Sequence, residues 1–229
     1  ATRSTPDWMS YAWLVLLGFG LLLTAKPAVA SARRAGRWAF IAISSLTCIT
    51  AALLFSLPDV VAHHHGHGYD TARAIAGFDS LVFGNHQPFG SLATLWAALL
   101  GMGDAFDASR VAAIACLPLM FAWAFTITGE RLAAILAAGL MMTQPAFLYM
   151  ARAETTTAQG LVLFLLAALW SAWAVKARSL PIFVAAIGAL CALGHYRLLG
   201  PVALAPVALF FLLPWAPQGR LPWRWIIPG

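Results

Sequence analysis

Residues 109–150 read SRVAAIACLPLMFAWAFTITGERLAAILAAGLMMTQPAFLYM, and this stretch decides the class of fold. Two apolar runs, residues 109–128 and 131–150, are separated only by a short turn, Gly129–Glu130. Each run has about the 20 residues that an α-helix needs to cross the hydrocarbon core of a membrane. Because the connection is so short, the two helices must be antiparallel neighbours. The stretch therefore predicts two consecutive membrane spans.

The rest of the chain repeats this pattern. In the whole sequence 62% of the residues are apolar and 10% are charged, whereas about a quarter are charged in an ordinary soluble domain. A soluble domain of 229 residues cannot bury so much apolar surface, which excludes a soluble enzyme. We predict an all-α fold, one transmembrane domain over residues 1–229. It would be a polytopic helix bundle of about seven spans, the other five being residues 8–24, 38–58, 158–175, 180–194 and 198–215.

Charge predicts the orientation of the bundle. The apolar segment Ser91–Gly103 has only 13 residues, which suits an interfacial or re-entrant helix better than a span. If it does not cross, 9 of the 14 basic residues lie on one side, and the positive-inside rule makes that side cytoplasmic. They are Lys26, Arg33, Arg34, Arg37, Arg131, Lys176, Arg178, Arg220 and Arg224.

This orientation places the N-terminus outside and the C-terminus inside. We expect an integral protein of a bacterial cytoplasmic (inner) membrane, in contact with membrane lipids. The net charge of +6 is explained by loop placement, because the basic residues are scattered between apolar runs. The sequence therefore predicts no nucleic-acid partner.

The longest outer segment, about residues 59–108, contains most of the histidines and acidic residues of the chain. Asp70–Phe78 and Ser91–Gly103 have the pattern of two short amphipathic helices, with a turn at residues 85–88 between them. Helices of this kind lying on the outer leaflet would frame a cavity at the membrane boundary. A lipid-linked substrate would meet polar side chains there.

Several stretches resemble the GT-C superfamily of membrane glycosyltransferases, which use polyprenyl-phosphate sugars and include protein mannosyltransferases and aminoarabinose transferases. The similar stretches are, in chain order, YDTARAIAGF, NHQPFGSL, GMGDAFDASRVAAI, QPAFLYMARAE and LGHYRLLGPVALAP. The resemblance covers about residues 38–215 and corresponds to the N-terminal half of the family. It implies transfer of a sugar from a polyprenyl-phosphate carrier to an acceptor on the outer face. The family's acidic position falls near His64–His65, and the nearest acids in this chain are Asp59 and Asp70.

Candidate site residues follow from that chemistry. Transfer to a hydroxyl needs a carboxylate that accepts the acceptor's proton, and the catalytic candidates are Asp70 and Asp59. A phosphate is matched by a guanidinium, and the phosphate-binding candidates are Arg152, Arg197 and His195. Each also has a simpler interpretation: Asp70 as a helix N-cap, Asp59 as a polar anchor, Arg152 as half of an outer-loop charge pair with Glu154, and Arg197 and His195 as interfacial residues. Arg110, close to Asp104 and Asp107, is expected to form a local ion pair.

The histidines of the outer loop suggest one cofactor. His63, His64, His65 and His67 form a dense cluster, and imidazole suits zinc and other transition metals. The hypothesis is a divalent metal ion held by His65 and His67, with Asp70 as a further ligand. The alternative is a solvated polar loop near the lipid headgroups.

A second function remains open beside the enzyme. The chain could be a non-catalytic subunit of GT-C-like ancestry that supports a larger membrane complex, for example a photosynthetic or respiratory one. The concentration of acids, histidines and arginines on the outer side favours the enzyme. The displaced family acid favours the subunit, whose partners would be other membrane subunits.

Overall fold

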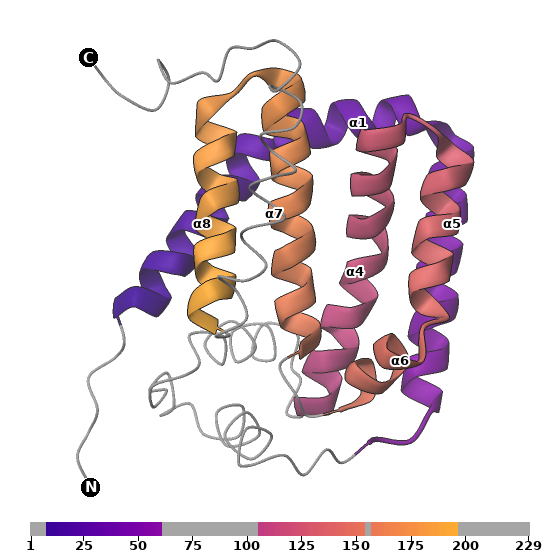
Figure 1. Cartoon of the computed structure of the whole chain (residues 1–229). Coiled ribbons are helices and arrows are strands. Elements are labelled where there is room, and N and C mark those ends of the chain that lie inside the picture. Colours follow the sequence, from indigo (N-terminus) through magenta and orange to yellow (C-terminus); the bar gives the residue numbers. More distant parts are fainter. Residues whose placement is uncertain (1–7, 61–104, 154–156, 197–229) are drawn as a thin grey trace, which may run out of the picture.

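The computed structural model describes residues 8–60, 105–153 and 157–196, and over these residues the chain is almost entirely helical (Figure 1). An isolated parallel bridge joins Val60 to Ala153. The helices pack into a bundle, which confirms the predicted all-α fold. They are α1 (Trp8–Ser56), α4 (Ala105–Thr128), α5 (Arg131–Met142), α6 (Pro145–Arg152), α7 (Thr157–Ala177) and α8 (Leu180–Tyr196).

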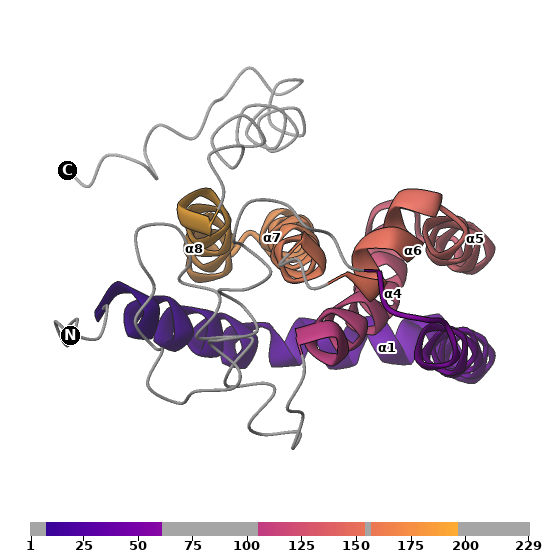
Figure 2. The same cartoon turned by 90° about the horizontal axis from the view of Figure 1, so that it is seen from below.

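Helix α1 runs for 49 residues and bends sharply at Gly36. Figure 1 shows it rising past α8, crossing the top of the view and descending behind α5, and Figure 2 shows the descending arm under α5. Gly36 has φ 80° and ψ 169°, a conformation that residues with a Cβ rarely adopt. The expected spans 8–24 and 38–58 therefore belong to two arms of one kinked helix. We call residues 25–36, which join the arms, the crossing segment.

The described residues contain fewer candidate spans than the about seven that the sequence predicted for the whole chain. Three helices, α1, α4 and α7, are long and apolar enough to cross a membrane. A fourth span is possible if α5 and α6 count together, although the chain bends by 62° between them. Helix α8 is apolar but has only 17 residues, and residues 198–215 lie outside the described part.

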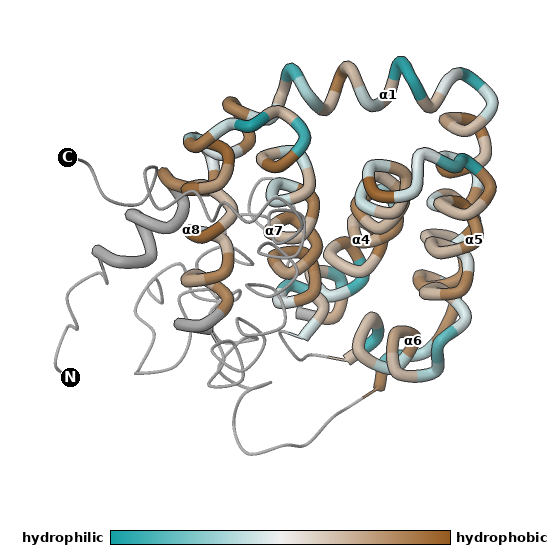
Figure 3. The backbone as a smooth tube through the Cα atoms, turned by 45° about the horizontal axis from the view of Figure 1, so that its top comes forward, coloured by the Kyte–Doolittle hydropathy of each residue, from teal (hydrophilic) through white to brown (hydrophobic). Residues whose placement is uncertain are grey.

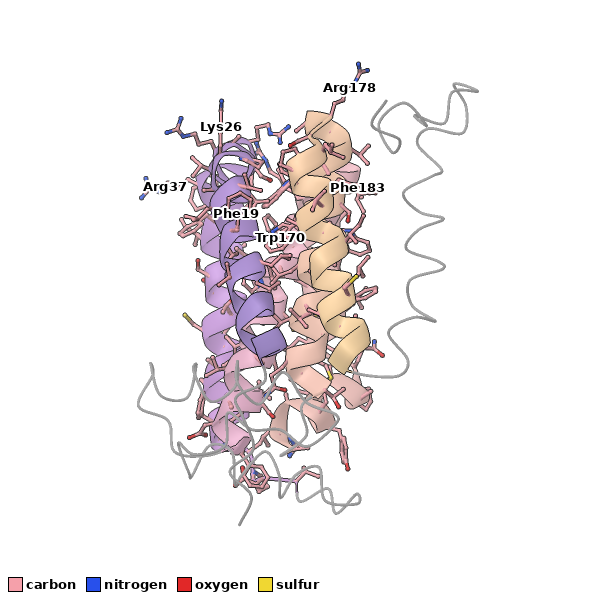
Figure 4. All side chains as sticks on the ribbon, turned by 90° about the vertical axis from the view of Figure 1, so that its left-hand side faces the viewer. Phe19, Lys26, Arg37, Trp170, Arg178 and Phe183 are labelled. Atoms are coloured by element: carbon pink, nitrogen blue, oxygen red, sulfur yellow. The ribbon has the colours of Figure 1, made fainter. Side chains whose placement is uncertain are left out.

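The core of the bundle forms around α7, which packs between α4 and α8. Trp170 of α7 is almost completely buried and lies between α7 and the first arm of α1 (Figure 4). The close approach depends on Gly20, because a Cβ at that position would lie 2.5 Å from Cη2 of Trp170. The first arm of α1 is thereby held against α7 and α8.

The helices are apolar along most of their length, and hydrophilic residues gather near the ends of the bundle (Figure 3). Large apolar side chains on the surface would be costly in water, but they suit contact with lipid tails. Trp38, Leu22 and Val15 are each more than 70% exposed. Lys26, Arg37 and Arg178 project at one end (Figure 4), which we call the basic end.

Candidate functional site

Arg110, in the second turn of α4, lies against the last turn of α1 at the end of the bundle opposite the basic end. Its Nε donates to the carbonyl oxygen of Leu54 at 3.1 Å, and its Nη2 donates to that of Leu57 at 3.3 Å. In an unbroken helix the Leu54 carbonyl would accept from residue 58, but that residue is Pro58 and has no N–H. The guanidinium replaces the missing donor, and its positive charge suits a helix C-terminus.

The same guanidinium holds two carboxylates. Arg110 Nη1 pairs with Oδ1 of Asp107 at 2.9 Å, one turn earlier on α4, and Nη2 pairs with Oδ1 of Asp59. Its Cζ also lies 5.5 Å from the centre of the Phe55 ring, a cation–π contact. The Arg110 side chain is 9% exposed, whereas those of Asp59 and Asp107 are 42% and 33% exposed. The buried charge is therefore paired, and the carboxylates remain within reach of solvent or a ligand.

Arg152 ties the end of α6 to the chain that leaves α1. Its Nε donates to the carbonyl oxygen of Leu148 at 3.0 Å, and its Nη1 donates to that of Pro58 at 3.4 Å. In the opposite direction, the N–H of Val60 donates to the carbonyl oxygen of Arg152 at 3.0 Å. Because both neighbours of Asp59 bond to Arg152, these contacts place the two candidate residues on adjoining segments.

A buried amide lies at the same end. Gln159, in the first turn of α7, is 8% exposed, and neither its Nε2 nor its Oε1 has a hydrogen-bond partner within the described residues. A buried amide without partners costs about 1–3 kcal/mol. Sequence reasoning missed this residue, since a single Gln in an apolar run gives no signal of its surroundings.

The other candidates fall mostly outside the described part. His195 belongs to the last turn of α8, and because α8 runs back from the basic end, its backbone lies at the same end as Asp59. The side chain of His195 is not described. Asp70, Arg197, His65 and His67 lie outside the described residues, as do both expected interfacial helices. Within the described residues, His, Cys, Asp and Glu form no group of three that could hold a metal ion.

The predicted local ion pair of Arg110 is confirmed for Asp107, and Asp104 is not described. Sequence reasoning missed the pairing of Arg110 with Asp59. A weak signal existed, because Pro58 removes a donor at the end of an apolar run. Nothing in the sequence showed which arginine would supply it.

Comparisons of the chain with protein-family models, with curated proteins and with solved structures found no match.

Proposed function

We propose that this chain is a membrane glycosyltransferase similar to the GT-C superfamily. It would move a sugar from a polyprenyl-phosphate carrier to an acceptor hydroxyl on the outer face of a bacterial cytoplasmic membrane. The proposal includes about seven spans, the two interfacial helices of the outer loop, and an N-terminus outside. The observation that carries it is the adjoining placement of Asp59 and Arg152 at the end opposite the basic residues.

In this proposal, Arg152 binds the phosphate of the donor, and Arg197 and His195 assist it. The acceptor oxygen attacks the anomeric carbon while the bond from that carbon to the phosphate oxygen breaks. Asp70 or Asp59 takes the hydroxyl proton, and polyprenyl phosphate leaves with the electron pair. Arg152 has the chemistry for this role, because a guanidinium offers two parallel donors to phosphate oxygens. A divalent metal ion at His65 and His67 would add positive charge at the same end.

A second candidate function is the non-catalytic subunit of a larger membrane complex. One observation favours it: Asp59 and Asp107 both bond to Arg110, which also holds the end of α1. Carboxylates used in this way have a structural role, and an enzyme would then depend on Asp70. Substitution of Asp59 or Asp70 should lower turnover if the chain is the enzyme, and should change only stability or assembly if it is the subunit.

Donor binding tests the proposal first. The full chain in lipid nanodiscs is titrated with a polyprenyl phosphate of defined length, and binding is followed by native mass spectrometry. Arg152→Ala should weaken binding by about 1.5–3 kcal/mol, the value of a hydrogen bond to a charged group. Arg178→Ala, at the basic end, is the matched control and should leave binding unchanged. Equal affinity in Arg152→Ala and wild type would remove Arg152 from the site.

Transfer of a labelled sugar from the carrier to membrane acceptors tests the chemistry. Replacing the general base, by Asp70→Asn or Asp59→Asn, should lower turnover by about 10²–10⁴. Asp107→Asn is the control, because it also removes the negative charge of one partner of Arg110 but none of the proposed base function. If neither Asp70→Asn nor Asp59→Asn changes turnover, the enzyme proposal fails in this form. If wild type shows no transfer and copurifies with other membrane subunits, the second function is favoured.

A further inference from the structure

The crossing segment of α1 lies over the basic end of the bundle and carries a groove on its exposed side. Figure 3 shows hydrophilic residues along this part of α1, between its two apolar arms. We propose that the groove binds the phosphate headgroups of anionic phospholipids. The groove is lined by Ala25, Lys26, Val29, Ala30, Arg33 and Arg34.

Helical periodicity puts the three cations of the groove on one face. Arg33 and Arg34 follow Lys26 by seven and eight residues, which is about two turns of helix. Val29 and Ala30 lie one turn from each of them and leave an apolar surface between the charges. The phosphate of a bound phospholipid would therefore meet cations from both ends of the groove. The glycerol and upper acyl carbons of the lipid would lie against Val29.

The three cations of the groove form no ion pair with any acid in residues 8–60, 105–153 and 157–196. Within the described residues, Lys26, Arg33 and Arg34 are exposed and their side chains make no hydrogen bond or ion pair. Two other cations of this end are already engaged: Arg131 Nη2 donates to the carbonyl oxygen of Arg34 at 3.2 Å, and Lys176 Nζ donates to that of Thr126. The charge in the groove is thus free to attract an anion, and water and salt screen it only in part.

The position of the groove favours a lipid phosphate over a free one. Both arms of α1 continue from the crossing segment into apolar helix. Phe19 on the first arm and Trp38 on the second arm are each more than half exposed. A helix that joins two such arms across one end of the bundle lies near the level of the headgroups. Anionic lipids concentrate phosphate at that level, and each basic residue near such a surface strengthens binding.

Lipid titration tests this inference independently of the glycosyltransferase proposal. The full chain in neutral detergent is titrated with phosphatidylglycerol or phosphatidylcholine, and bound lipid is counted by native mass spectrometry. We expect preference for phosphatidylglycerol, weakened by salt. The triple variant Lys26→Gln, Arg33→Gln and Arg34→Gln should lose about 100-fold in affinity, because each cation contributes about fivefold. Arg178→Gln is the control at the same end and should lose little.

Three results would overturn the inference. One is equal binding of the two lipids, which indicates an apolar site without charge recognition. Another is unchanged affinity for phosphatidylglycerol in the triple variant, with Arg33→Gln alone as a second test if the triple variant is poorly folded. The third is full displacement of the lipid by inorganic phosphate at equal concentration, which indicates a site for a free anion.

Discussion

Arg110 of α4 pairs with Asp59, which lies 51 positions earlier in the chain and follows the C-terminal end of α1. The pair closes the junction of α1 and α4, two helices long and apolar enough to cross a membrane, at the end of the bundle opposite the basic end. The same guanidinium also satisfies the Leu54 carbonyl, which Pro58 leaves without a helical donor. One side chain therefore ends a helix, fixes the start of a loop and orients a candidate catalytic carboxylate.

Arg110→Met should destabilise the protein, although methionine keeps a long, unbranched side chain at this position. It removes hydrogen bonds to two carbonyls and two carboxylates, and we expect a loss of about 1.5–3 kcal/mol in the free energy of unfolding. The loss stays below that of a fully buried pair because Asp59 and Asp107 are partly exposed. Denaturant unfolding in micelles measures it, with Arg178→Met as the exposed control. Equal losses in the two variants would show that the Arg110 contacts contribute nothing specific.

Gly20→Ala should separate the first arm of α1 from α7. The new Cβ would lie 2.5 Å from Cη2 of Trp170 and 3.2 Å from the Cβ of Ala185, so the helices must move apart. Such overpacking costs about 1–3 kcal/mol. Gly18→Ala is the matched control, because its Cβ meets nothing within 4 Å and alanine favours helix. Thermal unfolding should show a lower midpoint for Gly20→Ala only, and a fall of the same size in both would contradict the predicted contact.

Gly36→Ala should strain the bend between the crossing segment and the second arm. A residue with a Cβ pays about 1–3 kcal/mol to hold the positive φ found at Gly36. Gly139→Ala on α5 is the control, since that glycine has ordinary helical geometry and open space around it. Unfolding in micelles should show a loss for Gly36→Ala alone. A stabilised Gly36→Ala would mean that the helix runs straight through this position.

The class of fold was predictable because it depends on composition and on the length of apolar runs, both of which a sequence shows directly. The runs at 109–128 and 158–175 correspond closely to α4 and α7. The run at 131–150 did not reveal its break at Thr143–Gln144, where the chain turns by 62° ahead of Pro145. A proline in an apolar run has no fixed meaning by itself, since Pro118 lies inside the intact helix α4.

The candidate site was predictable only in the types of its residues. Asp59 and Arg152 were chosen for their chemistry and for their place at membrane edges, and the bundle puts their segments side by side. The contact of Arg152 with the Pro58 carbonyl and the contact of Arg110 with the Leu57 carbonyl were not predictable. Each joins a side chain to a backbone carbonyl about 50 to 90 residues away in the chain. Carbonyl groups are the same at every residue, so a sequence does not mark which of them will be used.

Cysteine labelling tests which end of the bundle faces outward. Two exposed positions suit it, Pro58 beside the candidate site and Ala177 at the basic end. In a background without the three native cysteines, an impermeant reagent added to intact cells should modify Pro58→Cys and spare Ala177→Cys. The reason is the positive-inside rule, which retains the end that carries Lys26, Arg37 and Arg178 in the cytoplasm. Permeabilised cells are the control, since both positions should then react. Labelling of Ala177→Cys alone in intact cells would show that the bundle has the opposite orientation. Asp59 and Arg152 would then face the cytoplasm, which contradicts sugar transfer on the outer face.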